Sequence, residues 1–272
     1  MRKFLALALA CMLLVATLAS CAAGLGDPDA INDYTPEVKT ITTDKGVFTF
    51  EEAAGDTAIL VGYNGRATKD DHVEIPAEFN GRPVVGIGDE VFYNLAAVVE
   101  VKIPETVTSI GKFAFANCTE LESITLPAGT LSIDNNAFQG CTKLTSIDLG
   151  DALVSIGDYA FTNCPVLADI ALPATLESIG LYAFAYDVAL TEFTAPAALK
   201  ELGTLAYYNC TGLTSIKLSD TIETFGEFVF VTEKTTMKAI IDTTSYSEGS
   251  KAAEYVAAMA DTVVEEETKA AA

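Results

Sequence analysis

The feature that most constrains this chain is a repeat of 23 residues that runs through most of its length. Several columns of residues keep this spacing without insertion or deletion. A glycine column comprises Gly88, Gly111, Gly157, Gly180, Gly203 and Gly226, with Asp134 once in its place. An aromatic column comprises Phe92, Phe115, Phe138, Phe161, Phe184, Tyr207 and Phe230. One unit of this size cannot bury its own apolar face, so neighbouring units must stack, and the repeat predicts a solenoid.

Each unit combines short extended segments with a turn. The alternating, branched residues of Leu121–Leu126 predict a strand, and a second short strand is expected over Leu176–Ile179. The segment Asp158–Asn163 is interpreted as a single helical turn. The glycine column suggests a backbone position with positive φ. A recurrent asparagine, as at Asn163, indicates a left-handed residue at the end of that turn.

Composition excludes several classes of function. The chain has 272 residues, is 50% apolar and carries a formal net charge of -22, so it is globular and strongly acidic. An acidic surface repels phosphate backbones and anionic lipid headgroups, so we expect no nucleic-acid partner. His72 is the single histidine, and the motifs of common hydrolases, nucleotide-binding proteins and metalloproteases are absent. The raw material for histidine-ligated metal clusters and for most histidine-based acid–base chemistry is therefore lacking, and we expect no metal site.

The first residues indicate export from the cytoplasm. A short basic segment is followed by an apolar run over Phe4–Leu18, which is too short for a typical membrane span and fits a signal peptide. The tetrapeptide Leu18-Ala19-Ser20-Cys21 resembles the bacterial lipobox, in which the cysteine is acylated. We therefore expect a lipoprotein signal peptide over residues 1–20, lipidation at Cys21 and a flexible tether over residues 21–45.

The repeat unit itself resembles the BspA-like, or treponemal-type, leucine-rich repeat of bacteria. Leu121–Cys141 and Leu167–Gly180 match its pattern most closely, and the resemblance extends over about residues 58 to 262. It implies an α/β leucine-rich repeat solenoid of predominantly short β-strands, with one short helical turn per 23-residue repeat and a cap at both ends. It also implies a surface-exposed bacterial protein that acts in adhesion or protein recognition, without catalysis and without a cofactor.

The pattern places the boundaries of the folded part. We expect an N-terminal β cap with the first repeat over residues 46–88, the regular repeats over residues 89–241, and a C-terminal helical cap with an acidic tail over residues 242–272. The unit around Leu190 departs from the pattern at Asp187, Phe193 and Ala195.

The candidate binding face consists of the strand residues that flank the buried aliphatic column, because alternate side chains of a strand point to opposite faces. These residues vary in type while the core columns do not, as on a binding surface carried by a scaffold. They are Glu100, Lys102, Ser123, Thr125, Ser146, Asp148, Asp169, Ala171, Glu192, Thr194, Ser215 and Lys217.

Three alternatives remain open from the sequence. The binding surface could instead be a second aromatic column, which comprises Phe113, Tyr159, Tyr182, Leu205 and Phe228. The cysteines of one column are expected to be buried free thiols, with disulfides between neighbouring units as the alternative; they are Cys118, Cys141, Cys164 and Cys210. The expected function is recognition of a protein or glycan partner at the cell surface. The alternatives are a structural scaffold of envelope complexes and a carboxylate-based glycan hydrolase, for example through Asp148 and Asp169.

Overall fold

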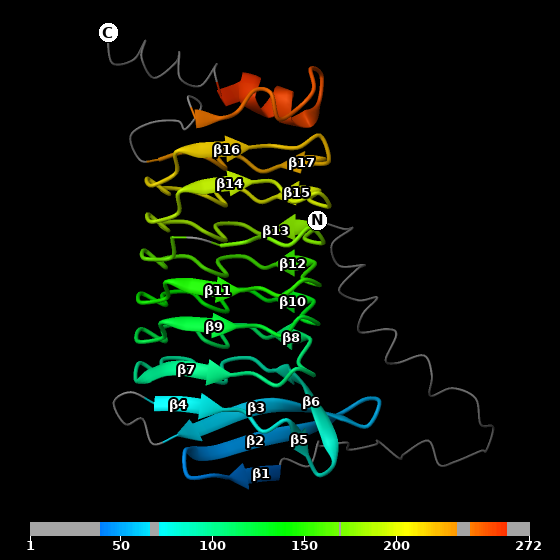
Figure 1. Cartoon of the computed structure of the whole chain (residues 1–272), viewed down its shortest axis with the longest axis vertical. Coiled ribbons are helices and arrows are strands. Elements are labelled where there is room, and N and C mark those ends of the chain that lie inside the picture. Colours follow the sequence, from blue (N-terminus) through cyan, green and yellow to red (C-terminus); the bar gives the residue numbers. More distant parts are fainter. Residues whose placement is uncertain (1–38, 66–70, 169, 233–239, 260–272) are drawn as a thin grey trace, which may run out of the picture.

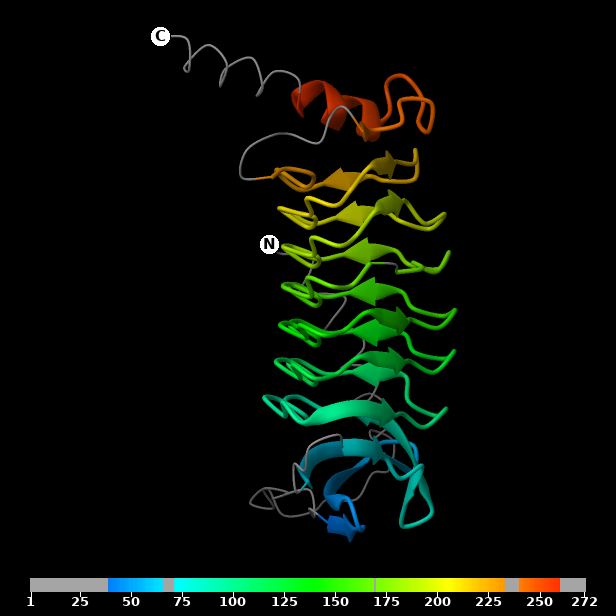
Figure 2. The ribbon, with the colours of Figure 1, turned by 60° about the vertical axis from the view of Figure 1, so that its left-hand side comes forward.

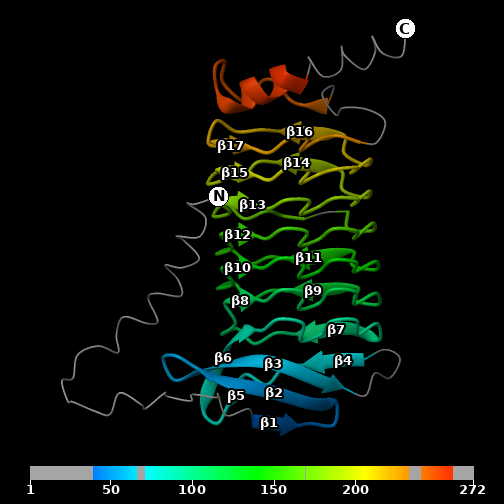
Figure 3. The ribbon, with the colours of Figure 1, turned by 180° about the vertical axis from the view of Figure 1, so that it is seen from behind.

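The computed structural model describes residues 39–65, 71–168, 170–232 and 240–259. The described chain forms a stack of rungs that rises from β1 at one end to a helix at the other (Figures 1, 2 and 3). The expected signal peptide, Cys21, residues 21–38 of the expected tether, Asp169 and the tail beyond residue 259 lie outside the described residues.

The N-terminal cap combines three antiparallel strands with a short second hairpin. It consists of β1 (Lys39–Thr42), β2 (Gly46–Ala53) and β3 (Thr57–Gly65), followed by β5 (Glu78–Phe79) and β6 (Arg82–Ile87). Strand β1 pairs with β2 through four residue pairs, from Lys39↔Phe50 to Thr42↔Val47. The expected tether over residues 21–45 is therefore wrong at its C-terminal end, because residues 39–42 are already part of the sheet.

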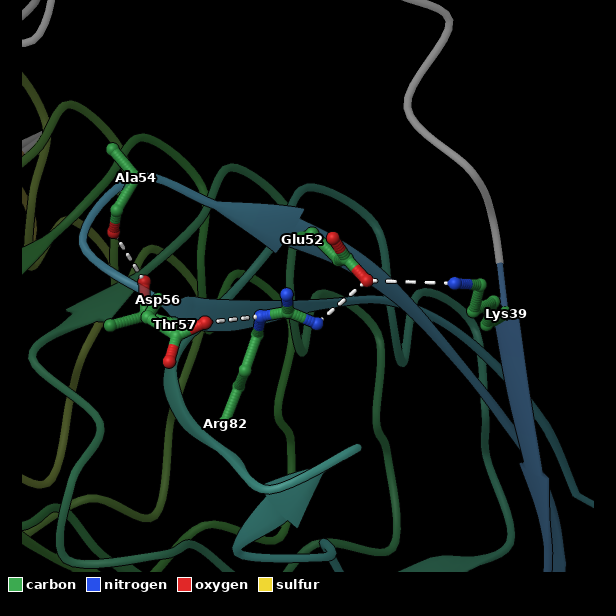
Figure 4. Close-up of polar contacts among 6 residues, drawn as sticks. All are labelled: Lys39, Glu52, Ala54, Asp56, Thr57 and Arg82. Carbon is green, nitrogen blue, oxygen red and sulfur yellow. Dashed lines mark hydrogen bonds and ion pairs between the residues drawn. The ribbon is translucent and has the colours of Figure 1, made fainter.

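Ion pairs connect the strands of this cap (Figure 4). The Arg82 guanidinium donates from Nε to Asp56 Oδ1 and from Nη1 to Glu52 Oε1, each at 2.7 Å. The hydrogen bond to Asp56 is the main reason that the pKa of Arg82 is raised. Lys39 Nζ lies 3.6 Å from the same Glu52 oxygen. Arg82 thus links β6 to the β2–β3 hairpin, and Lys39 links β1 to it.

One side of the solenoid is a continuous sheet, called here the long sheet. Strand β3 pairs in parallel with β6, and β6 with β8; the two-residue strands then follow in order, each one repeat after the last. They are β8 (Ser109–Ile110), β10 (Ser132–Ile133), β12 (Ser155–Ile156), β13 (Ser178–Ile179), β15 (Glu201–Leu202) and β17 (Thr224–Phe225). The second strand predicted for each unit is confirmed, although it is shorter than Leu176–Ile179.

The other side, called here the split face, consists of three separate parallel pairs. They are β4 (Asp71–Glu74) with β7 (Val98–Lys102), β9 (Ser123–Thr125) with β11 (Ser146–Asp148), and β14 (Glu192–Thr194) with β16 (Ser215–Lys217). Between β11 and β14, the described residues 170–172 form no strand. The C-terminal end is covered by a helix over residues 251–259.

Two ladders of side chains fill the space between the faces. Rings of the aromatic column stack from rung to rung; Phe115 and Phe138, for example, have centroids 5.1 Å apart and an interplanar angle of 2°. The four column cysteines are free and buried. Each thiol donates to a phenylalanine carbonyl of the preceding rung, as Cys141 Sγ does to Phe115 O at 3.2 Å. Burial raises the pKa of Cys118 to about 12. The free-thiol prediction is confirmed.

The glycine column is required for a different reason than the sequence suggested. None of its members has a positive φ. Instead, a Cβ added at Gly157 or Gly180 would lie 2.6 Å from a backbone nitrogen of the preceding rung. Glycine is needed there because neighbouring backbones approach closely, so the expectation of positive φ was wrong.

The turns after these glycines hold the left-handed residues. Two positions of these turns have φ between 53° and 72°, and the turn at Phe228 has only the first of them. The first is held by Glu90, Phe113, Asn136, Tyr159, Tyr182, Leu205 and Phe228. The second is held by Asn94, Asn117, Gly140, Asn163, Tyr186 and Asn209, which confirms the left-handed asparagine. The predicted helical turn over Asp158–Asn163 is not confirmed, because positive φ at Tyr159 and Asn163 is incompatible with a right-handed helix.

Candidate functional site: the split face

The split face presents rows of exposed side chains in strict register. Ser123 pairs with Ser146 and Thr125 with Asp148, while the aliphatic residue between them is buried. The same arrangement recurs one pair further on, where Glu192 lies opposite Ser215 and Thr194 opposite Lys217. Of the twelve residues predicted to form the binding face, Asp169 lies outside the described residues, Ser215 is half-buried and the other ten are exposed.

Charged residues gather at the N-terminal end of this face. His72 Nδ1 lies 2.7 Å from Glu100 Oε2, and Lys102 Nζ donates to Glu74 Oε1 at 2.6 Å. The latter hydrogen bond raises the pKa of Lys102. These residues, with Thr43, Asp44, Lys45 and Val73, line a hollow of about 510 Å³.

Strand β4 therefore extends the face by one rung, and His72 and Glu74 belong to it. From the sequence, His72 was noted only as the single histidine of the chain. The signal that could have placed both residues was the Val73-Glu74-Ile75-Pro76 segment, which repeats the buried-exposed-buried pattern of the later strands.

A cavity of about 320 Å³ interrupts the middle of the face. It is lined by residues 170–172, 174 and 192–197 and by Tyr207. In the preceding rung Ile147 and Leu149 are 7% and 2% exposed, whereas their equivalents Ile170 and Leu172 are only half-buried. The following rung has Phe193 where other units have isoleucine or valine, and its ring packs on Tyr207 with centroids 4.9 Å apart. The departure seen in the sequence thus produces a local hollow.

Two polar groups are buried beneath this region. Asp187 takes a place in the cysteine column and accepts the backbone N–H of Cys164 at 2.7 Å through Oδ1. Its Oδ2 and the Tyr207 hydroxyl have no hydrogen-bond partner among the described residues. Burial raises the pKa of Asp187 well above its ordinary value, so the carboxyl group holds its proton more tightly than in solution.

The second aromatic column lies on the turns between the two faces. The rings of Tyr159 and Tyr182 stack with centroids 5.2 Å apart. The ring of Tyr208 packs edge-on against Tyr182, with centroids 6.3 Å apart. Phe228 is 48% exposed, while Phe113, Tyr159, Tyr182 and Leu205 are half-buried. The column is thus a partly covered stripe and less accessible than the split face.

The described residues offer little for metal-dependent chemistry. Within them, no group of three or more histidine, cysteine, aspartate or glutamate side chains could hold a metal ion. Of the carboxylate pair offered for glycan hydrolysis, Asp148 is exposed on β11 and Asp169 lies outside the described residues. Of the helices in this part of the chain, none combines the length and apolar character needed to cross a membrane.

Comparison with known proteins identifies the repeat. The family model described as the BspA type leucine rich repeat region matches residues 85–213 and 177–253, with six copies. Among solved structures, the leucine-rich repeat protein of T. pallidum is 31% identical, with a TM-score of 0.62 over 68% of this chain and 85% of that one. Among curated proteins, none matches.

Two further solved structures share the fold. A leucine-rich repeat protein of Bacteroides ovatus is 26% identical with a TM-score of 0.54, over 71% of this chain and 57% of that one. A leucine rich cell surface protein of Faecalibacterium prausnitzii is 30% identical with a TM-score of 0.50, over 66% and 54%. The chain thus spans just over half the length of these two proteins. The family model covers more than half of the chain, and we conclude that it belongs to the BspA-type leucine-rich repeat family.

Proposed function

We propose that this chain is a non-catalytic recognition protein of the bacterial cell surface, which binds a partner protein through its split face. Repeat proteins of this kind commonly use an extended face of the solenoid to bind proteins. One similar structure is described as a cell surface protein, which supports the proposed location.

The observation that carries this proposal is the contrast between an apolar column beneath the strands and the varied side chains exposed on either side of it. The buried column residues of β9 and β11 are both isoleucine, and the exposed residues beside them are held in register at fixed spacing. The exposed set changes from charged residues on β7 to hydroxyl groups on β9 and back to charge on β14 and β16. Such a surface can bind a specific partner without any change in the scaffold.

Two hollows make the split face uneven, unlike the surface of a flat sheet. The charged hollow beside His72 and Glu100 lies at one end, and the cavity beside Phe193 and Tyr207 lies in the middle. Interfaces are strongest where a partner side chain fills a pocket and is shielded from water. We therefore expect the strongest contacts of the partner at these two places.

The test is a binding screen with the full chain against arrays of purified host matrix proteins and bacterial surface proteins. Ser123→Arg and Ser146→Arg place bulky charge on the split face and should weaken any specific binding at least about tenfold. Ser109→Arg, on the exposed side of the long sheet, is the matched control and should leave binding unchanged. A partner that is lost with the control but retained by the two split-face variants would contradict the proposal.

Attachment to the membrane is proposed separately, through acylation of Cys21. Two or three acyl chains provide a stable anchor, since each buried methylene contributes about 0.8 kcal/mol. Cells that express the full chain and are fed a labelled fatty acid should incorporate the label, and Cys21→Ala should abolish incorporation. Labelling that persists in Cys21→Ala would refute acylation at this residue. A structural role in envelope complexes predicts instead that only the bacterium's own envelope proteins are captured in the screen.

A further inference from the structure

The cavity beside Phe193, called here the split-face cavity, has a counterpart three repeats earlier. A hollow of about 270 Å³ lies between β7 and β9 and is lined by residues 100–103, 105, 123–125 and 127. Adding three periods of 23 residues to these positions gives, with Glu100 as the one exception, residues that line the split-face cavity. The two hollows therefore occupy the same place in different rungs, and they can be compared residue by residue.

The two hollows differ in charge. The hollow between β7 and β9 has a lysine of its own, Lys102, whose ammonium group donates to Glu74 Oε1 at 2.6 Å. The equivalent residue of the split-face cavity is Ala171, and the described residues that line this cavity include no lysine or arginine. Glu192 also lines the cavity, is exposed, and forms no ion pair with any described residue. The split-face cavity thus has a carboxylate without a counter-ion.

A buried hydroxyl group without a partner lies under the split-face cavity. The Tyr207 side chain reaches the floor of the cavity, is 1% exposed, and its hydroxyl makes no hydrogen bond to the described residues. Three repeats earlier the equivalent residue is Phe138, which has no hydroxyl group. Because an unpaired buried hydroxyl is costly, a ligand that pairs with the Tyr207 hydroxyl gains affinity.

The backbone beside the cavity is also incompletely paired. In the next rung Ala195 N donates to Lys217 O at 2.9 Å. The equivalent bond one repeat earlier, from Leu172 N to Thr194 O, is not formed within the described chain, which leaves the Thr194 carbonyl without that donor. The half-buried side chains of Ile170 and Leu172 form apolar walls. The cavity therefore combines apolar walls with acceptors that lack donors.

We propose that the split-face cavity binds a basic side chain, arginine or lysine, of the partner protein, an inference that rests on the proposed function of the split face. The stem of either residue packs against Ile170 and Leu172, because its methylene groups are apolar. The charged head carries donors only, which suits the Tyr207 hydroxyl, the Thr194 carbonyl and the Glu192 carboxylate as acceptors. The partner thus supplies the cation that the chain itself supplies in the hollow between β7 and β9.

Other side chains fit the cavity less well. An acidic side chain is repelled by Glu192 and by the net charge of -22. An apolar side chain fills the volume but leaves the Tyr207 hydroxyl unpaired and removes water from Glu192. A neutral polar side chain satisfies the hydroxyl but not the carboxylate. The signature of the site is therefore selectivity for positive charge.

The experiment is an NMR titration of the isotope-labelled full chain with the N-acetyl methylamides of arginine, lysine, norleucine and glutamate. The backbone signals of Phe193, Thr194 and Ala195 report binding at the cavity. We expect the two basic probes to bind at least about tenfold more tightly than the norleucine probe, and the glutamate probe not to bind. Equal affinity for the norleucine probe, or no shift of these signals with the basic probes, would overturn the proposal.

Paired variants separate the cavity from general electrostatic attraction. Glu192→Gln should weaken binding of the basic probes at least about tenfold, whereas Glu122→Gln, at an exposed carboxylate near β9, should not. Ala171→Lys should abolish binding by placing the chain's own cation in the cavity, and Ser109→Lys, which adds the same charge to the long sheet, should retain it. Circular dichroism checks that each variant is folded. Equal losses in both members of a pair would show a non-specific effect and refute the site.

The result can be told apart from failure of the proposed function. If a partner found in the binding screen is lost with Ser123→Arg but binds Ala171→Lys unchanged, the split face is the binding surface and the inference about the cavity fails. If the basic probes bind the cavity but the screen finds no protein partner, the proposed function fails and the charge selectivity of the cavity stands.

Discussion

Two stretches of the solenoid share one period but not one core. The rungs of residues 107–164 are called here the regular stretch. In them Phe115, Phe138 and Phe161 stack within 2° of parallel, and cysteines fill the adjacent column. The rungs of residues 165–218 are called here the deviating stretch. In them Asp187 replaces a cysteine and Tyr207 replaces a phenylalanine. There the split face loses a strand, a cavity opens, and two polar atoms remain buried without partners among the described residues.

The comparison shows which contacts set the register of the rungs. The long sheet continues through both stretches, and Ser155 pairs with Ser178 and Ser178 with Glu201 without a shift. The side chains of the core can therefore change without displacing the rungs. We infer that the long sheet and the turns fix the spacing, whereas the core columns determine how well the split face closes.

The largest effect on stability is expected from a substitution that removes a core ring of the regular stretch. Phe138→Ala should lower the free energy of unfolding by about 3–5 kcal/mol, because a fully buried ring between two stacked rings is removed. Tyr207→Ala should cost less, because a cavity already lies beside this ring and the hydroxyl group has no partner among the described residues. Urea denaturation measures both. An equal or larger loss for Tyr207→Ala would show that the two stretches are packed equally well.

The next largest effect on stability is expected from a substitution that restores the cysteine column in the deviating stretch. Asp187→Cys should raise the free energy of unfolding by about 1–3 kcal/mol near neutral pH, because a buried carboxyl oxygen without a partner among the described residues is removed.

The pH dependence of the same variant gives a sharper test. Because the pKa of Asp187 is raised by folding, the unfolded chain loses this proton at lower pH than the folded chain. The folded state then binds more protons, so stability falls as pH rises above the unfolded pKa of about 3.9. Asp187→Cys removes this fall. The gain in free energy of unfolding from Asp187→Cys should therefore grow between pH 4 and pH 7. A gain that is independent of pH would contradict protonation of Asp187.

A smaller effect concerns single buried hydroxyl groups. Tyr207→Phe should stabilise the protein by about 1 kcal/mol, since the lost hydroxyl makes no hydrogen bond to the described residues. Thr130→Val makes the same change in the regular stretch, where Thr130 Oγ1 is also buried without a partner among these residues. Thermal denaturation of both variants separates the cost of the hydroxyl from that of the cavity. Destabilisation by Tyr207→Phe would indicate that its hydroxyl binds an ordered water.

The smallest effect concerns the second left-handed position of the turns. Tyr186 holds φ at 66° where other rungs have asparagine or glycine. Tyr186→Asn should stabilise the chain by about 0.5 kcal/mol, because asparagine tolerates this backbone region better. The reverse change in the regular stretch, Asn163→Tyr, should destabilise it by a similar amount. A denaturation series measures both variants. If Tyr186→Asn destabilises the chain instead, the ring contacts of Tyr186 outweigh its backbone strain.

Much of the fold could be predicted because the repeat determines it directly. The constant spacing of columns such as that of Phe138 and Phe161 fixed which residues stack, and the alternation around Ile124 predicted which neighbours are exposed. The candidate face could be listed for the same reason. Whether that face binds a partner stays a prediction.

The errors came from contacts that a local pattern does not contain. Glycine at Gly157 is required by a backbone one rung away, so its φ could not be inferred from residue type. Positive φ at Phe113 and Tyr159 was missed because aromatic residues rarely adopt it; here the rungs on either side impose it. Strand β1 was missed because the short segment Lys39–Thr42 has no column to mark it.

The stacking of like residues 23 positions apart has a consequence for how the chain folds. Contacts between neighbouring rungs join residues of nearly constant, modest separation along the chain, as in Ser132↔Ser155 and Ser155↔Ser178. Folding can therefore propagate from one nucleus, with each ordered rung as the template for the next. The β2–β3 hairpin lies at the end that is synthesised first. A growing polypeptide could thus add one finished rung for each 23 residues that emerge, long before its C-terminal helix exists.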